Sequence, residues 1–474
     1  MFERLIIHGG RVVTPGGVID GADVLIDGER IAAITAPGAV DWPDAERVSA
    51  EGLLVLPGVV DPHTHIQLDT GIYQTSDDWA IGTQTAAFGG VTTVVDFATQ
   101  FPGMTLPAAL EARLAECAPA IIDYAHHMMV TDLPTDPAEA RRALAELLEL
   151  GVPSIKLYTT YRPNYYADDA VILHTLRAMP EGMIALVHCE NDAIVSDATA
   201  RLVAAGDTAW AFHGAGRPPE AEVEAIRRVL YLAKAANKPV YLVHNSTAAS
   251  IQEVARARAT GDFPPVFCET CPQYFVLDDG RYAGANAEHF ILQPPLRAPE
   301  WQVDLAAAWP VINVISTDHC DYTLAQKQEF EDFSKTPGGL PGLETSFQLA
   351  YTHAMQYVAG REVGGRVLAA DDVLVDLVRL MATEPARLFG LYPCKGALQP
   401  GSDADVLLYD PASTVTIQTE KTHTIGGYNP YNGMTVQGRV VSVLSRGMFL
   451  VREGAWQDPP AGRGQFLHGK PLTG

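Results

Sequence analysis

Residues 55–65 read Val55-Leu56-Pro57-Gly58-Val59-Val60-Asp61-Pro62-His63-Thr64-His65, a short apolar run that ends in two histidines. Further apolar runs follow along the chain, each about as long as a buried strand. They span residues 93–97, 121–128, 154–158, 184–188, 240–244, 266–269 and 311–317. Alanine-rich helical patterns lie between several of them, most clearly at 137–150 and 220–236. Strands alternating with helices in this way predict an α/β fold, a (β/α)8 TIM-like barrel, although a doubly wound open sheet would show the same alternation.

The two ends of the chain carry a different pattern. Short apolar runs alternate with glycine turns before residue 35, and similar runs return after residue 403. Short strands at this spacing are typical of a small β-sandwich, here formed by both chain ends. We therefore predict a small β domain from residues 1–56 and 395–474, the latter with a tail, around a metal-dependent barrel at 57–394.

The composition excludes several classes of function. The chain has 474 residues, of which 47% are hydrophobic, and a formal net charge of -24, which disfavours nucleic acid or an anionic membrane as a partner. The segment Met1–Ile7 lacks the apolar core of a signal peptide, and no apolar run has the length of a membrane span. The 6 cysteines are scattered, which predicts reduced thiols and a cytoplasmic location. Cys268 and Cys271 form a CxxC that fits a strand end and its turn better than a zinc knuckle.

Metal-ligand residues stand at the ends of four predicted strands. His63 and His65 are two positions apart, so in an extended segment both imidazoles face the same side. His188, His244 and Asp318 each close or directly follow another apolar run. A barrel gathers the side chains at the carboxyl ends of its strands, so these residues predict one shared metal site.

Lys156 lies inside the apolar run 154–158. A buried ammonium is unfavourable unless it is paired or chemically altered. A lysine that extends to solvent or forms a salt bridge is the alternative.

Several motifs in their order along the chain are similar to one family. They are Pro57 to His65, Lys156-Leu157-Tyr158-Thr159-Thr160-Tyr161, Val187-His188-Cys189-Glu190-Asn191, Glu269-Thr270-Cys271-Pro272-Gln273-Tyr274, Ser316-Thr317-Asp318-His319-Cys320 and Gly401-Ser402-Asp403-Ala404-Asp405. Over nearly the whole chain they resemble the dihydropyrimidinase and hydantoinase branch of the amidohydrolases. The resemblance implies a hydrolase that opens the amide bond of a cyclic ureide to an N-carbamoyl amino acid.

The same resemblance implies a centre with two divalent metal ions, for which zinc is expected and manganese or cobalt are alternatives. It places His63, His65 and Asp318 on one metal and His188 and His244 on the other. Lys156 would be carboxylated by carbon dioxide and bridge both. Asp318 would take the proton from the attacking water and pass it to the ring nitrogen. Tyr161 would donate to the carbonyl oxygen, with a packing tyrosine as the alternative.

The sequence determines the identity of the bound ring less closely. Dihydroorotases carry an arginine two residues after the HxH pair, but this chain has Gln67, which disfavours a carboxylated ring. Relatives commonly have serine at Gln293 and asparagine at Gly338, positions whose family contacts run through backbone atoms. We expect Tyr158, Tyr161, Gln293 and Gly338 to bind the substrate. Tyr158, with Tyr165 and Tyr166, would favour an aryl or alkyl hydantoin, although Tyr165 and Tyr166 also fit a solvent-facing loop.

Two alternatives remain beside a hydantoinase or dihydropyrimidinase. One is an allantoinase-like hydrolase of another cyclic amide. The other is a non-catalytic scaffold related to dihydropyrimidinase, which would have lost several ligand positions, whereas all are present here. The family also implies a homotetramer or homodimer, with C-terminal segments that reach across to neighbouring subunits.

Overall fold

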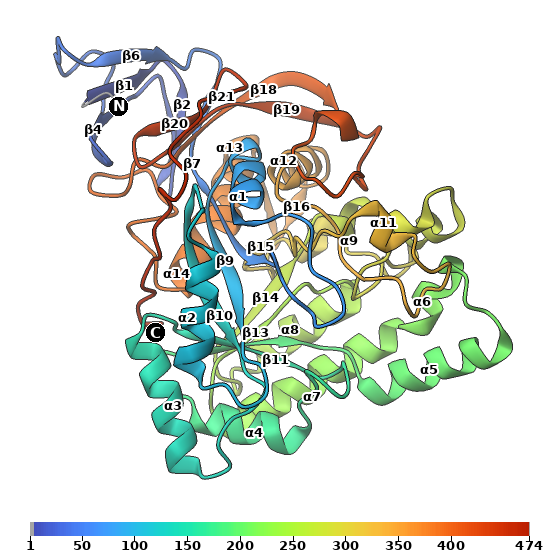
Figure 1. Cartoon of the computed structure of the whole chain (residues 1–474). Helices are drawn as coiled ribbons and strands as arrows, with labels where there is room; N and C mark the ends of the chain where they lie inside the picture. The colour runs from blue at the N-terminus through green and yellow to red at the C-terminus, as the bar shows by residue number, and fades with distance from the viewer. Residues whose placement is uncertain (1–3, 474) are drawn as a thin grey trace.

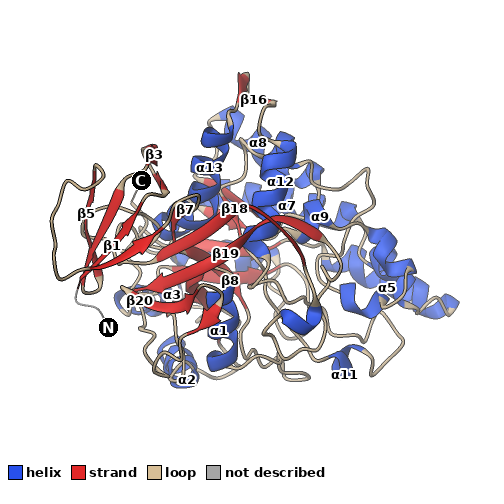
Figure 2. Ribbon diagram, turned by 90° about the horizontal axis from the view of Figure 1, so that it is seen from above, coloured by secondary structure: helices blue, strands red, loops and turns tan. Residues whose placement is uncertain are grey.

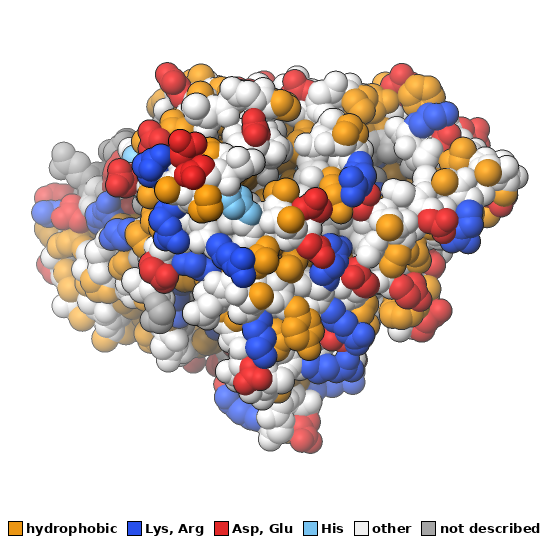
Figure 3. All heavy atoms as spheres, turned by 90° about the horizontal axis from the view of Figure 1, so that it is seen from below, with side chains coloured by type: hydrophobic (Ala, Val, Ile, Leu, Met, Phe, Trp, Pro, Cys, Tyr) orange, Lys and Arg blue, Asp and Glu red, His pale blue; other side chains and the backbone are white. Residues whose placement is uncertain are grey.

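The computed structural model describes residues 4–473. Met1–Glu3, part of the segment in which no signal peptide is predicted, and Gly474 lie outside the described residues. Between residues 4 and 473, no helix combines the length and apolar character needed to cross a membrane. On the face shown in Figure 3, acidic and basic side chains are interspersed rather than gathered into one basic patch.

Eight parallel strands form the centre of the molecule in sequential order (Figure 1). They are β8 (Val59–Thr64), β9 (Val91–Thr99), β10 (Asp123–Met129), β11 (Ser154–Tyr158), β12 (Ile184–His188), β13 (Val240–Leu242), β14 (Val266–Thr270) and β15 (Val314–Ile315). A parallel bridge between Thr64 and His319 joins the last strand to the first, with the His65 N–H donating to the His319 carbonyl at 2.7 Å. The predicted barrel is therefore confirmed, and the open sheet is excluded.

Helices pack around the outside of the barrel (Figure 1). The longer ones are α1 (Trp79–Phe88), α2 (Leu106–Glu116), α3 (Pro137–Glu149), α4 (Asp169–Ala178), α5 (Asp192–Ala205), α7 (Pro219–Ala236), α8 (Ala248–Thr260), α12 (Ser346–Tyr357) and α13 (Ala370–Val378). The shorter ones are α6 (His213–Gly216), α9 (Gln273–Val276), α10 (Leu305–Ala308), α11 (Leu324–Lys327) and α14 (Glu384–Leu388). Helix α3 shows why they form, because Asp136 caps its first N–H groups, a proline follows, and Leu144 and Leu147 face the core.

Three predicted strands differ most from the structure. The run 55–61 is not one strand, because β7 (Leu54–Pro57) belongs to the small domain and β8 begins after Gly58. A Cβ at Gly58 would lie under 3.0 Å from the Thr92 side chain, so this crossing between domains needs glycine. Strands β13 and β15 are shorter than the predicted runs 240–244 and 311–317. The predicted end of β13 fails at His244, whose φ angle of 35° is outside the extended region.

Both ends of the chain build the small domain, as predicted (Figure 2). One sheet has the order β5-β4-β1-β6, and the other, β21-β20-β19-β18-β7-β2-β3, pairs N-terminal with C-terminal strands. These strands are β1 (Arg4–His8), β2 (Arg11–Thr14), β3 (Gly17–Asp20), β4 (Asp23–Asp27), β5 (Arg30–Thr35), β6 (Glu46–Ser49), β18 (Val406–Thr416), β19 (Thr435–Ser445), β20 (Met448–Arg452) and β21 (Ala455–Trp456). Ile7, Val24, Val406 and Leu444 belong to one apolar core between the two sheets, which explains why neither end can form the domain alone.

A buried ion cluster joins the small domain to the barrel. Lys395 is 1% exposed, and its Nζ lies 2.6 Å from Asp123 at the start of β10, 2.8 Å from Asp403 and 2.9 Å from Asp405. The C-terminal tail then runs back to its own barrel, where Leu472 N–H donates to the Gly182 carbonyl at 2.7 Å. This part of the chain packs at the start of strands β10 to β12. The expected contact of C-terminal segments with neighbouring subunits stays a prediction.

Candidate functional site

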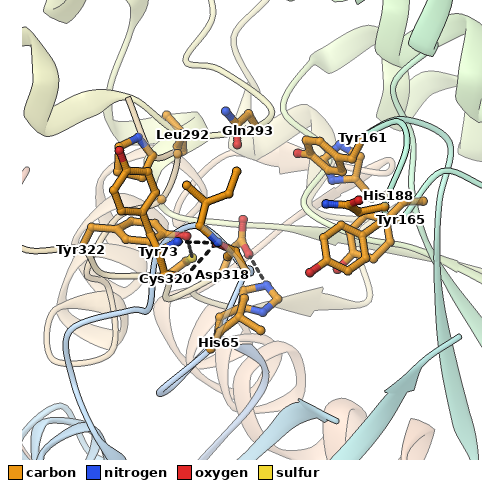
Figure 4. Close-up of a pocket in the computed structure, with 18 of the residues that line it drawn as sticks. His65, Tyr73, Tyr161, Tyr165, His188, Leu292, Gln293, Asp318, Cys320 and Tyr322 are labelled. Atoms are coloured by element: carbon orange, nitrogen blue, oxygen red, sulfur yellow. Dashed lines mark hydrogen bonds and ion pairs between the residues drawn. The ribbon is translucent and has the colours of Figure 1, made fainter. Parts of the chain in front are cut away.

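One pocket of about 490 Å³ opens at the carboxyl ends of the barrel strands (Figure 4). The six predicted metal-ligand residues and the four expected substrate-binding residues all line it. They are His63, His65, Lys156, Tyr158, Tyr161, His188, His244, Gln293, Asp318 and Gly338. Residues more than 270 positions apart in the sequence are brought together because each one follows or ends a strand of the same barrel.

The first group of ligand-type atoms surrounds Asp318. Its Oδ1 lies 3.2 Å from His63 Nε2 and 3.4 Å from His65 Nε2. On the other side of the ring, His63 Nδ1 lies 2.7 Å from Glu269 Oε1, so the ring proton belongs on Nδ1 and a lone pair faces Asp318. A lone pair and a carboxylate oxygen repel unless a cation lies between them. Two tetrahedral ligands of zinc stand about 3.3 Å apart, close to the observed separations.

The second group consists of two histidines. His188 Nδ1 lies 2.9 Å from His244 Nε2, while His188 Nε2 faces Glu190 at 2.7 Å. Glu190 therefore holds the His188 proton on the outward nitrogen and leaves a lone pair towards His244. Burial lowers the pKa of both imidazoles, far below the usual value for His244, so both are neutral and able to bind a cation. The donor set fits a divalent metal in each group.

Two carboxylates that orient these histidines were missed as functional residues from the sequence. Glu269 is fully buried and also accepts from Tyr241 Oη at 2.6 Å and the His244 N–H at 2.8 Å. Glu190 is fully buried as well and pairs with Arg217 at 2.6 Å and 3.0 Å. A signal was present, because Glu269 lies near the end of a strand and Glu190 stands two residues after His188. Carboxylates behind metal-binding histidines are a common arrangement.

Lys156 is 1% exposed and lies at the base of the pocket. Its Nζ is 3.4 Å from His63 Nε2, and within residues 4–473 no carboxylate lies within 4.0 Å of it. The predicted alternatives, a salt bridge or a solvent-exposed amine, are therefore both wrong. Burial lowers the pKa of Lys156 to about 8, opposed by Asp318 and Glu269, so a neutral amine is accessible near neutral pH. The contrast with Lys395, which contacts three carboxylates, shows how unusual this unpaired lysine is.

Tyr161 and Asp318 face the same space from strained backbone positions. Their φ angles are 76° and 51°, a region that non-glycine residues adopt rarely and mostly at functional sites. The Tyr161 ring packs 5.0 Å from His188 and lies under the Arg217 guanidinium. Burial raises the pKa of Tyr161 well above its usual value, so its hydroxyl stays protonated and is available as a donor.

Aromatic and aliphatic side chains form the outer part of the pocket. Tyr73, Tyr158, Tyr165, Tyr322 and Leu68 line it. Tyr166 does not, because it packs under the Arg162 guanidinium at 3.6 Å, so the prediction that it lines the pocket is wrong. Gln67 also lies off the pocket, with its side chain accepting from the Trp79 N–H. The mouth holds Arg162 and Lys335, but each is paired with an aspartate.

A second group of metal-ligand residues lies beside the site. Asp77, His319 and Asp321 are buried, and their ligand atoms lie within 4.8 Å of one another. The Gly342 N–H donates to His319 Nδ1 at 3.1 Å, so a neutral ring carries its proton on Nε2, 3.3 Å from Asp321. That nitrogen has no lone pair for a metal. The cluster instead connects the strand end at Asp318 to the loop at Ser76 and the segment at Thr424.

Two further histidines and the CxxC pair have structural roles. His126 packs in the core outside the barrel, against Trp79. His127 lies 2.9 Å from the Pro62 carbonyl and thereby supports the strand that carries His63. Cys268 lies in β14 and Cys271 in the turn after it, as predicted.

Comparisons with known proteins agree on one family. The chain is 38% identical over 478 aligned positions to D-phenylhydantoinase of Escherichia coli O81 (strain ED1a), covering 99% of each protein. It superposes on dihydropyrimidinase from Brevibacillus agri NCHU1002 with a TM-score of 0.92 at 35% identity, over 99% of this chain and 100% of that one. An L-hydantoinase (dihydropyrimidinase) from Arthrobacter aurescens gives a TM-score of 0.84 at 27% identity, over 99% and 100%. No protein-family model matches the chain.

Proposed function

Because the chain belongs to the dihydropyrimidinase and hydantoinase family, we propose that the pocket is a two-metal centre that opens the ring of a 5-substituted hydantoin. The protein is a cyclic amidohydrolase: it hydrolyses the amide bond of a cyclic ureide, a hydantoin or dihydropyrimidine, to the N-carbamoyl amino acid. The convergence of four imidazoles, Lys156 and Asp318 in one aromatic-lined pocket is the observation that carries the proposal.

The ligand positions divide into two sets. His63, His65 and Asp318 would hold one divalent cation, and His188 and His244 the other. Imidazole and carboxylate ligands suit zinc best, with manganese and cobalt as substitutes. Bound cations would supply Lewis acidity to the ring carbonyl and lower the pKa of the attacking water. A scaffold without catalysis is disfavoured, because none of these ligand positions is lost.

Lys156 would bridge the two sets after carboxylation. Its neutral amine would attack the carbon of carbon dioxide. A C–N bond would form as one C=O π bond breaks and its electron pair moves to oxygen, and one N–H proton would leave to solvent. The product is a carbamate whose two oxygens can each face one set of ligands. This reaction replaces an unpaired buried ammonium with an anion among cations, which explains a lysine at a position without a carboxylate partner.

Asp318 and Tyr161 would act on the substrate itself. Asp318 accepts the proton of the attacking water and returns it to the ring nitrogen as the C–N bond breaks. The protonated Tyr161 hydroxyl donates to the carbonyl oxygen, on which negative charge develops. The backbone of Gln293 and Gly338, which line the pocket, would bind the ring edge. Tyr158 and Tyr165 would pack against the substituent at ring position 5, which favours an aryl or alkyl hydantoin over dihydrouracil.

We further propose a homotetramer or homodimer in a reducing, cytoplasmic environment. The free state of all six cysteines supports the environment. Light scattering of the purified protein after gel filtration would give the subunit number.

The test is ring opening by protein supplied with zinc and bicarbonate. We would compare 5-phenylhydantoin, dihydrouracil and allantoin, and measure the ureido product with metal content determined on the same sample. Preferential turnover of 5-phenylhydantoin supports the proposal. A better rate on dihydrouracil would shift the assignment to a dihydropyrimidinase. If protein with two metals per chain hydrolyses neither 5-phenylhydantoin nor dihydrouracil, both substrate assignments are refuted and another cyclic amide is favoured.

Bicarbonate labelled with carbon-13 tests the carboxylation of Lys156 separately from the proposed substrate. A carbamate carbon signal should appear in the wild-type protein and be absent in Lys156→Ala. Two bound metals and full activity without that signal would refute carboxylation.

A further inference from the structure

The wall of the pocket opposite His65 is formed by two backbone segments, 291–294 and 338–340, that are fastened by buried groups (Figure 4). The Ile291 carbonyl accepts from Lys327 Nζ at 2.6 Å and from the Gly339 N–H at 3.0 Å. The next carbonyl, that of Leu292, accepts from His213 Nε2 at 2.8 Å. The Pro294 carbonyl accepts from Tyr274 Oη at 2.9 Å. Polar groups on both sides of Gln293 are therefore satisfied within the protein.

The polar groups of Gln293 itself are not satisfied within the described part of the protein. Within residues 4–473, neither its backbone nor its side-chain amide forms a hydrogen bond to another protein group. The side chain is half-buried and lines the pocket, and Figure 4 shows it across the pocket from His65, with Asp318 between them in that view. A half-buried amide that the protein leaves unbonded is available to a ligand in the pocket.

Gly338 is the residue that makes room for this amide. A Cβ at position 338 would lie less than 3.0 Å from Cδ, Oε1 and Nε2 of Gln293. The φ angle of Gly338 is not positive, so the reason for glycine here is space rather than backbone conformation. Gln293 and Gly338 therefore share one volume, and a side chain at 338 would displace the amide of Gln293.

We propose that the side-chain amide of Gln293 recognises the ureide edge of the ring, and that Gly338 serves to hold open its place. An amide presents one donor and one acceptor side by side, which is complementary to a ring N–H next to a ring carbonyl. Gln293 is thus a specificity-determining residue whose side chain adds to the recognition by backbone groups. This inference rests on the proposed hydrolase function.

The experiment is a double-mutant cycle read as KM and kcat for 5-phenylhydantoin. Gln293→Ala should raise KM about fivefold to tenfold, the loss of one neutral hydrogen bond, with kcat within about twofold. Gln293→Leu keeps the volume and removes the hydrogen bonds, so it should raise KM as much as Gln293→Ala. Gly338→Ala should displace the flexible amide and raise KM similarly, whereas adding Gly338→Ala to Gln293→Ala should change nothing further.

Metal content and circular dichroism of each variant would be measured beside the wild type. A wild-type KM in Gln293→Leu would show that only volume matters and would overturn recognition by the amide. Additive effects of Gln293→Ala and Gly338→Ala on KM would refute the proposal that the two residues share one volume. Lack of turnover by the wild type on every cyclic ureide would count against the proposed function instead, so the two failures are distinguishable.

Discussion

Replacing Glu269 with glutamine is expected to weaken metal binding at the His63 group without unfolding the barrel. Glu269 is fully buried, and its Oε1 lies 2.7 Å from His63 Nδ1. Glutamine has nearly the same shape, and its carbonyl oxygen can still accept from the His244 N–H, while its NH2 group would donate to Tyr241 Oη. It loses the negative charge that holds the His63 proton on Nδ1 and makes Nε2 a better ligand.

The expected loss of metal affinity follows from the kind of hydrogen bond that is weakened. A hydrogen bond to a charged partner contributes about 1.5–3 kcal/mol, roughly twice a neutral one. A loss of about 1.4–2.7 kcal/mol corresponds to a tenfold to hundredfold weaker metal affinity, the range typical of carboxylates behind metal-binding histidines. We therefore expect Glu269→Gln to lose one of two metals at chelator concentrations that leave the wild type loaded, with a matching fall in kcat.

The assay is metal content by mass spectrometry after dialysis against a series of chelator concentrations. Tyr241→Phe is the matched control, because it removes the 2.6 Å bond to the other oxygen of Glu269 and leaves His63 untouched. It should change metal affinity less than about threefold, since Glu269 keeps its charge and its bond to His63 Nδ1. Wild-type affinity in Glu269→Gln, or an equal effect of Tyr241→Phe, would show that Glu269 does not act through its charge on His63.

Three further results are expected. Tyr161→Phe should lower kcat about 10²–10³-fold with metal content unchanged, and a near-normal kcat would exclude Tyr161 as the donor to the carbonyl oxygen. Lys395→Met should destabilise the protein by about 3–5 kcal/mol, because it leaves buried carboxylates without their cation; thermal unfolding close to that of the wild type would contradict this. Burial lowers the pKa of Lys327 from 10.5 to about 7, so between these values the unfolded chain binds more protons than the folded one. The stability of the wild type relative to Lys327→Met should therefore rise with pH by up to about 1.4 kcal/mol per unit, and a difference in melting temperature that is constant from pH 7 to pH 9 would refute it.

Local sequence patterns were sufficient to predict the overall fold of this protein. Apolar runs of strand length between helical patterns predicted the barrel, and strands 154–158 and 184–188 were predicted to the residue. The HxH pair and the residues at later strand ends predicted the ligand positions, because a barrel brings all its carboxyl strand ends to one face. The predicted strand boundaries were wrong where a long-range contact determines them. At Gly58 the chain leaves one sheet for another, and nothing in the apolar run 55–61 marks that crossing.

The sequence by itself determined the fold class, the family and the metal-ligand-type residues that meet in the pocket, since these depend on strand periodicity and on the order of motifs. Only the tertiary structure decided what those residues contact. It showed that Glu269 and Glu190 lie behind His63 and His188, and that Lys156 has no carboxylate partner within the described residues. It also showed that Gln67 lies off the pocket and that Gln293 occupies the space above Gly338. The physical reason is that side-chain direction, hydrogen-bond partners and excluded volume depend on residues far apart in the chain, which no local pattern specifies.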